Sequence, residues 1–131
     1  MQKINKEEKI ELASIKLKEK VVEGIQKKKG HDIVILDMAQ IENAVCRYFI
    51  VCHGDSNIQV TAIAESIEEH VKTSLHETIL HREGYKNAQW ILLDYGDVVV
   101  HVFQKPYREF YNLEALWADA ERNDIVEKLN I

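Results

Sequence analysis

The sequence predicts an α/β (α+β) fold, a mixed β-sheet with helices packed on it. Two long segments carry apolar residues at helical spacing, and several short segments are apolar or alternate in the manner of strands. One long segment stands between two predicted strands, an order typical of a strand–helix–strand unit. At 131 residues with 46% hydrophobic content, the chain is near the commonest domain size and can bury one core.

The first predicted helix covers residues 6–28. Ile10, Leu17 and Val21 recur at helical spacing and form an apolar stripe. Three lysines follow at the helix end, where cations suit the helix dipole, and Gly30 is expected to stop the helix. Contact with RNA is the alternative role for these lysines.

Strands are predicted where short apolar segments stand between turn signals. The second helix is expected at 56–76, and its Ser56 and Gln59 form a capping-box pattern. The strands on either side of this helix imply a right-handed parallel connection inside a mixed sheet. The predicted strands are 33–36, 46–53, 78–82, 89–95 and 97–104.

The last two of these strands form a predicted hairpin. Its turn, Asp94-Tyr95-Gly96-Asp97, has an acid on each side, and Gly96 suits the positive φ that such turns require.

Side chains alternate between faces along a strand. Trp90, Leu92 and Asp94 therefore share one face of the first hairpin strand, while Ile91, Leu93 and Tyr95 share the other. The valine row of the second hairpin strand is the better core row. If Ile91 and Leu93 join that row, Trp90 and Asp94 point outward.

Short helices are predicted after the hairpin. Pro106 fits the first turn of a helix, and Asn112 can cap the short helix that follows. Phe110 and Trp117 are expected to reach the core, because their helix must bury an apolar side.

The charge is divided unevenly along the chain. Residues 1–30 hold nine Lys and five Glu, a net charge of +4, whereas residues 31–131 carry −9 within a total of −5. An acidic body is a poor phosphate binder, because Lys and Arg supply most nucleic-acid affinity. It suits contact with a basic protein, although net negative charge also serves solubility alone.

Membrane and export signals are not expected. No apolar run approaches the ~20 residues of a membrane span, and the N-terminus lacks the hydrophobic region of a signal peptide. The sequence therefore predicts a cytoplasmic protein with no membrane partner.

The sequence supplies no residue set for catalysis, a cofactor or a metal. Cys46 and Cys52 lie on one predicted strand, about 20 Å apart when extended, too far for a disulfide, so both are expected to be buried thiols. None of the six histidines lies four residues from another, the usual spacing of a helical metal-ligand pair. His101 lies between two valines and is expected to form a hydrogen bond within the sheet.

Three segments of the chain resemble the ribosomal silencing factor family, also called Iojap-like. They are residues 48–56, 90–103 and 108–117, and with the strand near residue 33 the similarity spans roughly residues 10–119. The resemblance implies one silencing-factor domain over 1–119 and a charged C-terminal tail over 120–131. In this tail, Ile125 and Leu129 indicate a weak last helix.

The resemblance also implies a fold similar to the nucleotidyltransferase core. Gly54, Asp55 and Ser56 lie where such enzymes place a Gly-Ser pair at a helix start, a position suited to anions. Nucleotidyl transfer further needs carboxylates clustered on a neighbouring strand to hold Mg²⁺. No Asp-x-Asp or Glu-x-Asp occurs in the chain, so the core is expected to lack the catalytic carboxylates.

The function implied by the resemblance is that of a translational repressor. Such factors bind the large ribosomal subunit through its fourteenth protein, block joining of the small subunit, and lower translation in starvation or stationary phase. The family also suggests a homodimer, for which the apolar hairpin is a plausible site. Two alternatives stay open: a large-subunit assembly factor that acts as a dimer, and a cryptic nucleotide-binding transferase.

The expected contact surface centres on the hairpin. A tryptophan beside fixed charges is a common composition for the centre of an interface, so Trp90 is expected to be the desolvated anchor. Asp94 and Asp97 are expected to meet Arg or Lys of the ribosomal protein. The alternative for the aromatic residues is that they complete the core. The expected partner-binding residues are Trp90, Asp94, Tyr95, Asp97, Tyr111, Leu113 and Trp117.

Overall fold

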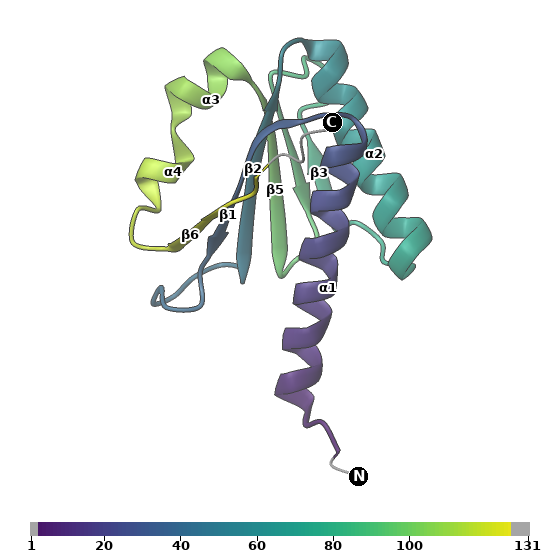
Figure 1. Cartoon of the computed structure of the whole chain (residues 1–131), viewed down its shortest axis with the longest axis vertical. Coiled ribbons are helices and arrows are strands. Elements are labelled where there is room, and N and C mark those ends of the chain that lie inside the picture. Colours follow the sequence, from purple (N-terminus) through teal and green to yellow (C-terminus); the bar gives the residue numbers. More distant parts are fainter. Residues whose placement is uncertain (1–2, 127–131) are drawn as a thin grey trace.

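Two long helices lie on one face of a six-stranded sheet, and two short helices lie on the other (Figure 1). The structure, a computed structural model, describes residues 3–126. The predicted α+β fold class with a mixed sheet is confirmed. The helices are α1 (Lys6–Lys27), α2 (Asn57–Leu75), α3 (Lys105–Tyr111) and α4 (Leu113–Leu116). The strands are β1 (His31–Asp37), β2 (Tyr48–Gly54), β3 (His81–Glu83), β4 (Trp90–Asp94), β5 (Val98–Gln104) and β6 (Glu121–Asp124).

The strand order is β3-β4-β5-β2-β1-β6. β2 and β5 pair in parallel, and the other neighbouring strands within residues 3–126 pair antiparallel. The predicted parallel connection is therefore present, but the strand beside β2 is β5 and not the next strand in the chain. After α2 the chain goes to the edge of the sheet as β3 and returns toward β2 through the β4–β5 hairpin.

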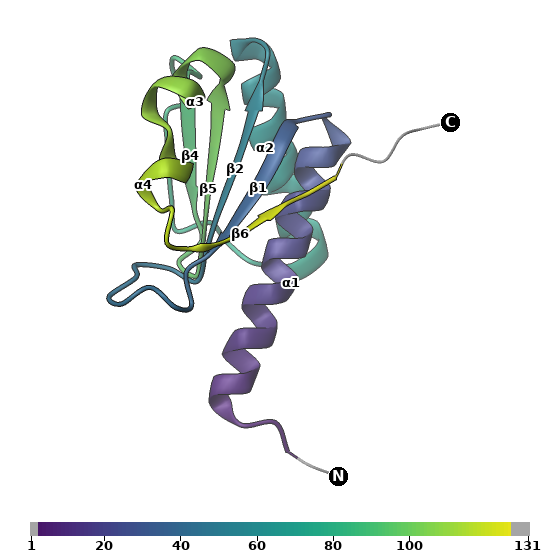
Figure 2. The ribbon, with the colours of Figure 1, turned by 60° about the vertical axis from the view of Figure 1, so that its left-hand side comes forward.

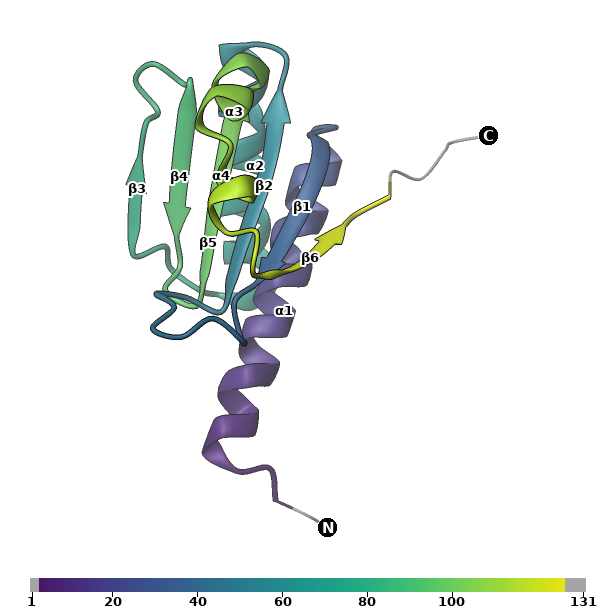
Figure 3. The same cartoon turned by 90° about the vertical axis from the view of Figure 1, so that its left-hand side faces the viewer.

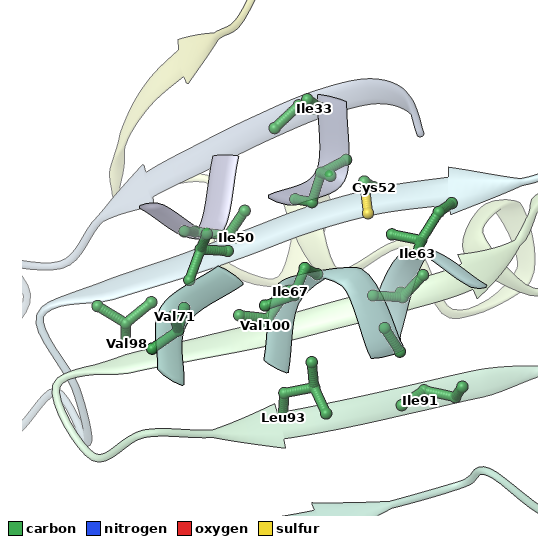
Figure 4. Packing of buried hydrophobic residues seen from close by; sticks show 14 of the residues in the cluster. Ile33, Ile50, Cys52, Ile63, Ile67, Val71, Ile91, Leu93, Val98 and Val100 are labelled. Carbon is green, nitrogen blue, oxygen red and sulfur yellow. The ribbon is translucent and has the colours of Figure 1, made fainter. Parts of the chain in front are cut away.

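The main core lies between the sheet and the two long helices. Ile91 and Leu93 of β4 join the valine row of β5 in this core, as the alternation of the sequence predicted (Figure 4). Gly24 of α1 lets the two helices approach closely, because a Cβ there would lie 2.9 Å from the Cα of Ile67 in α2. Because Ile91 and Leu93 point into this core, the alternate side chains of β4 lie on the opposite face of the sheet and form a second surface there.

The first half of α1 projects beyond the sheet (Figure 2). The predicted stripe is buried at Leu17 and Val21, but Ile10 is 51% exposed. The prediction that Ile10 belongs to a continuous core stripe is wrong, because helical periodicity cannot show where the sheet beneath the helix ends. Ser14 is the first buried residue of the helix.

The start of α2 follows the predicted capping pattern with one shift. Ser56 Oγ accepts the amide of Gln59 at 3.1 Å. Gln59 Oε1 accepts the amide of Asp55 at 2.7 Å, one residue before the amide that a capping box normally satisfies. The helix start therefore satisfies these two amides with its own side chains.

One expectation near the C-terminus is wrong. Asn112 lies between α3 and α4 in the left-handed conformation, and its side chain forms no capping hydrogen bond. The weak last helix indicated by Ile125 and Leu129 falls mostly on residues outside those described. Glu121–Asp124, just before it, form β6 against β1. Ladder hydrogen bonds to the free edge of β1 satisfy this backbone better than a short charged helix can. Leu129 lies outside the described residues.

Within residues 3–126, the structure contains no helix with the length and apolar character needed to cross a membrane.

Candidate protein-binding surface

The second face of the sheet is only partly covered. α3 packs against β5 and β2, and the helices leave β3 and most of β4 uncovered beside it (Figure 3). Trp90, Leu92 and Asp94 alternate onto this face of β4. Residues opposite one another on antiparallel strands share a face, so Glu83, opposite Leu92, and His81, opposite Asp94, lie there too. We call these five residues the open strip.

Contacts on several sides hold the ring of Trp90 in the open strip. The ring stacks on Phe103 with centroids 4.9 Å apart and meets Tyr111 of α3 at 4.8 Å. Its indole N–H donates to Nδ1 of His101 at 3.0 Å. A cavity of about 240 Å³, lined also by Tyr107, lies beside the half-buried indole. Trp90 therefore presents a fixed, partly exposed ring.

His101 is buried beneath this ring. Its hydrogen bond with Trp90 confirms the prediction that His101 is bonded within the sheet. Burial lowers the pKa of His101 to about 4, so the imidazole is neutral near pH 7. A neutral imidazole has one acceptor nitrogen, and Trp90 occupies it.

The hairpin turn concentrates negative charge. Asp94 Oδ1 accepts the amide of Gly96 at 2.7 Å, and Gly96 has the positive φ of 92° that the sequence predicted. Asp97 Oδ2 lies 3.1 Å from the hydroxyl of Ser14. Among the described residues, no Lys or Arg forms an ion pair with either carboxylate.

The field of these two carboxylates reaches Cys46. Burial first, and then the charges of Asp94 and Asp97, together raise the pKa of the Cys46 thiol to about 12. Cys46 and Cys52 are buried free thiols, as predicted. The turn thus carries negative charge that no cation of residues 3–126 neutralises in an ion pair, a suitable arrangement for a basic partner.

The remaining expected contact residues separate into two groups. Tyr111 is 47% exposed and touches Trp90, so it extends the open strip. Tyr95 is 8% exposed and belongs to the core beneath the long helices, on the other face of the sheet. Burial raises the pKa of its hydroxyl. The structure therefore does not bring Tyr95 to the surface that holds Trp90.

Leu113 and Trp117 are half-buried on the arm formed by α3, α4 and the following turn. Trp117 packs on Phe49 with ring centroids 5.7 Å apart and lies against a second, smaller core cluster. The prediction that Trp117 reaches a core is confirmed. The same prediction for Phe110 is wrong, because Phe110 is 79% exposed on the outer side of α3.

A buried arginine holds the arm against the sheet. Arg108 Nη1 donates to Nδ1 of His53 at 2.9 Å and to the carbonyl oxygen of His31 at 3.3 Å. Its Nε lies 3.6 Å from Glu114 Oε1, which has no hydrogen-bond partner within residues 3–126. Burial and the charge of Arg108 lower the pKa of His53, so His53 stays neutral and can accept this hydrogen bond.

A polar cavity of about 460 Å³ opens where β2 and β5 end. Ligands of α/β sheets commonly bind at the carboxyl ends of parallel strands, but Gly54, Asp55 and Ser56, where the transferase alternative places its anion site, do not line this cavity. The lining mixes both signs of charge, so a triphosphate would meet carboxylates as well as cations. Its ionisable residues are Asp32, His53, Lys105, Arg108, Glu109, Glu114, Arg122 and Asp124.

Three members of the open strip, His81, Glu83 and Leu92, were not expected as contact residues. Leu92 was detectable, because it shares the face of Trp90 by simple alternation. Glu83 was not, because its place depends on the register between β3 and β4. His101 was expected to bond within the sheet, but its partner Trp90 could be found only from the cross-strand pairing.

Comparison with known proteins decides the family. The family model described as "Ribosomal silencing factor during starvation" matches residues 11–130. The chain belongs to this family. The resemblance found in the sequence is thereby confirmed, and the match includes the open strip, the hairpin turn and the arm.

Relatives of known name agree with the assignment to the ribosomal silencing factor family. A Bacillus subtilis protein named ribosomal silencing factor RsfS is 46% identical over 98 residues, which cover 75% of this chain and 81% of that protein. The protein of the same name from Halalkalibacterium halodurans is 44% identical over 99 residues, covering 76% and 83%. A crystal structure of a Chromobacterium violaceum protein is similar with a TM-score of 0.74 and 34% identity, covering 88% of this chain and 94% of that one.

Proposed function

We propose that this protein is a translational repressor that binds the large ribosomal subunit and prevents the small subunit from joining. Membership of the ribosomal silencing factor family supports a ribosome-associated silencing role. The mechanism requires no chemistry, because a folded domain bound to the subunit-joining face excludes the other subunit by its volume. The relatives carry names of regulatory factors and not of enzymes.

The proposed partner on the ribosome is the fourteenth protein of the large subunit, bound through a basic surface. The observation that carries this proposal is the fixed, half-exposed indole of Trp90 on the same strand as Asp94, whose carboxylate forms no ion pair within residues 3–126. Buried aromatic anchors near charge pairs dominate the binding energy of many interfaces. Asp97 extends the acidic end of this surface.

The other expected contact residues take supporting roles in this proposal. Tyr111 and Leu113 widen the apolar part of the surface beside Trp90. Trp117 supports the arm from behind through its contact with Phe49. Tyr95 stabilises the turn from the core side and makes no contact with the partner.

Sedimentation of the purified protein with isolated large subunits tests the surface. Trp90→Ala is expected to weaken binding by about 30-fold or more, the usual loss at an interface anchor. Asp94→Arg is expected to weaken it as strongly, because it brings a cation against a basic partner. Both variants should keep the far-ultraviolet circular dichroism of the unsubstituted protein.

Two matched controls lie on the opposite side of the molecule. Ile58→Ala removes an exposed apolar side chain from α2, and Glu65→Arg reverses an exposed charge there. Both are expected to bind normally. Normal binding by Trp90→Ala or by Asp94→Arg would show that the proposed contact surface is wrong.

A further inference from the structure

We propose that His101 is a positioning residue, which holds the indole of Trp90 in the orientation that binds the partner. The fixed orientation of the Trp90 indole is a property of the fold. The consequence for binding rests on the function proposed above.

The strand register places the two side chains together. Trp90 lies opposite Phe103, and His101 lies opposite Leu92, two positions along on the same face. Diagonal neighbours across a ladder lie within reach of aromatic side chains. The indole N–H of Trp90 accordingly meets Nδ1 of His101 at 3.0 Å.

Contacts from three directions determine the orientation of the indole. Phe103 stacks on the ring with an interplanar angle of 26°, which sets its plane. The hydrogen bond to His101 sets its rotation within that plane, and Tyr111 closes a further side at 4.8 Å. Without the hydrogen bond, stacking alone would permit the ring to slide.

Folding alone gives no reason for an imidazole at position 101. Trp90 can only donate, so Nδ1 of His101 accepts and the proton of the neutral ring lies on Nε2. That nitrogen is buried and has no hydrogen-bond partner within residues 3–126. An unsatisfied buried N–H lowers stability, and an apolar side chain of similar size would avoid this loss. The acceptor for Trp90 is the contribution that the imidazole makes and an apolar side chain cannot.

A fixed indole binds more tightly than a mobile one. Association must order the side chains that enter an interface, and a side chain already held in its bound orientation avoids that loss of entropy. Loss of the hydrogen bond is therefore expected to weaken binding to large subunits by about three- to tenfold, while the area of contact stays the same.

The test compares His101→Leu with His101→Gln, which retains a side-chain acceptor. In nitrogen-15 labelled protein, the indole N–H signal of Trp90 reports the hydrogen bond, and that of Trp117 serves as the internal reference. His101→Leu should raise the solvent exchange rate of the Trp90 signal alone, with a melting temperature equal to or above that of the unsubstituted protein. His101→Gln should restore slow exchange.

Binding to large subunits completes the test. His101→Leu and Trp90→Phe, which lacks the donor, should both lose about three- to tenfold in affinity, and His101→Gln should bind nearly normally. Unchanged exchange of the Trp90 signal in His101→Leu overturns the positioning role. Faster exchange of the Trp90 signal in His101→Leu, with unchanged affinity for large subunits, also overturns this role, provided that Trp90→Ala binds weakly. If Trp90→Ala itself binds normally, the proposed contact surface is wrong, and the exchange rates still decide whether His101 holds Trp90.

Discussion

Ser14 of α1 and Asp97 of the hairpin turn are 83 positions apart in the sequence, and the Ser14 hydroxyl lies 3.1 Å from Asp97 Oδ2. The contact joins the long helix to the turn that carries the proposed acidic contact. It lies at the point where α1 leaves the sheet, so the projecting half of the helix stands beside the charged turn (Figures 1 and 2).

Ser14→Ala removes this contact. We expect a loss of about 1 kcal/mol in the free energy of unfolding, the usual effect of one hydrogen bond, measured by urea denaturation. Glu19→Ala, an exposed substitution on the same helix, is the control and should stay within about 0.5 kcal/mol of the unsubstituted protein. Equal stability of Ser14→Ala and this control would show that the contact contributes nothing.

Arg108→Ala should be the most destabilising substitution in the arm. Arg108 is 8% exposed, and its removal leaves Glu114 as an unpaired charge in a largely buried position. The expected loss is about 3 kcal/mol or more. Arg122→Ala, which breaks an exposed ion pair with Asp124, is the matched control with an expected loss of about 0–1 kcal/mol.

The position of the arm gives a second measure of the Arg108 substitution. Limited proteolysis of Arg108→Ala should cut within α3 and α4 before it cuts α1 or α2. Uniform cutting, or a stability equal to that of the control, would contradict the assignment of Arg108 as the residue that holds the arm.

Lowering the pH should destabilise the protein, because the pKa of His101 is lower in the folded state than in the unfolded chain. This pKa is lowered from 6.5 to about 4 in the folded state by burial, so below pH 6.5 the unfolded chain binds a proton that the folded chain does not. The stability present above pH 6.5 is therefore lost as the pH falls toward 4. Between pH 6.5 and 5 the loss attributable to His101 is about 2 kcal/mol.

His101→Leu isolates this effect, because His53, whose pKa is also lowered, remains in place. Urea denaturation at pH 7.5, 6 and 5 should show a smaller loss of stability in the variant than in the unsubstituted protein. Parallel losses in the two proteins would show that His101 titrates normally in the folded state.

The transferase alternative predicts binding of a nucleotide to the native state. A ligand that binds only the folded protein raises its melting temperature. We expect no shift with Mg-ATP, because the cavity at the ends of β2 and β5 mixes carboxylates with cations and the start of α2 already satisfies the amides of Asp55 and Gln59. A rise of several degrees would support the alternative.

Local sequence patterns predicted the two long helices and the two faces of the first hairpin strand. Helical periodicity located α1 and α2, and alternation placed Ile91 and Leu93 in the core with Trp90 and Asp94 on the other face. The exposure of Ile10 was not predictable, because it depends on where the sheet ends. The pairing of β6 with β1 was not predictable either, because edge pairing joins segments that are distant in the sequence.

The residues of the candidate surface also divide into those that local patterns predict and those that depend on pairing between strands. Trp90 and Asp94 follow from alternation along one strand, and the same alternation put Tyr95 on the other face, where the structure has it. Glu83 and the bond between Trp90 and His101 depend on cross-strand register, which one sequence does not reveal. A resemblance between segments cannot distinguish a residue that makes contact from one that supports it.

In the proposed function, the folded domain occupies the site of the small subunit on the large one. The most direct test of this function is sedimentation of the purified protein with separated subunits, followed by mixing of both subunits under joining conditions. We expect the protein to sediment with large subunits but not with small ones, and joined ribosomes to decrease as it is added. Failure to sediment with large subunits, or normal joining at saturating protein, would contradict the proposed function.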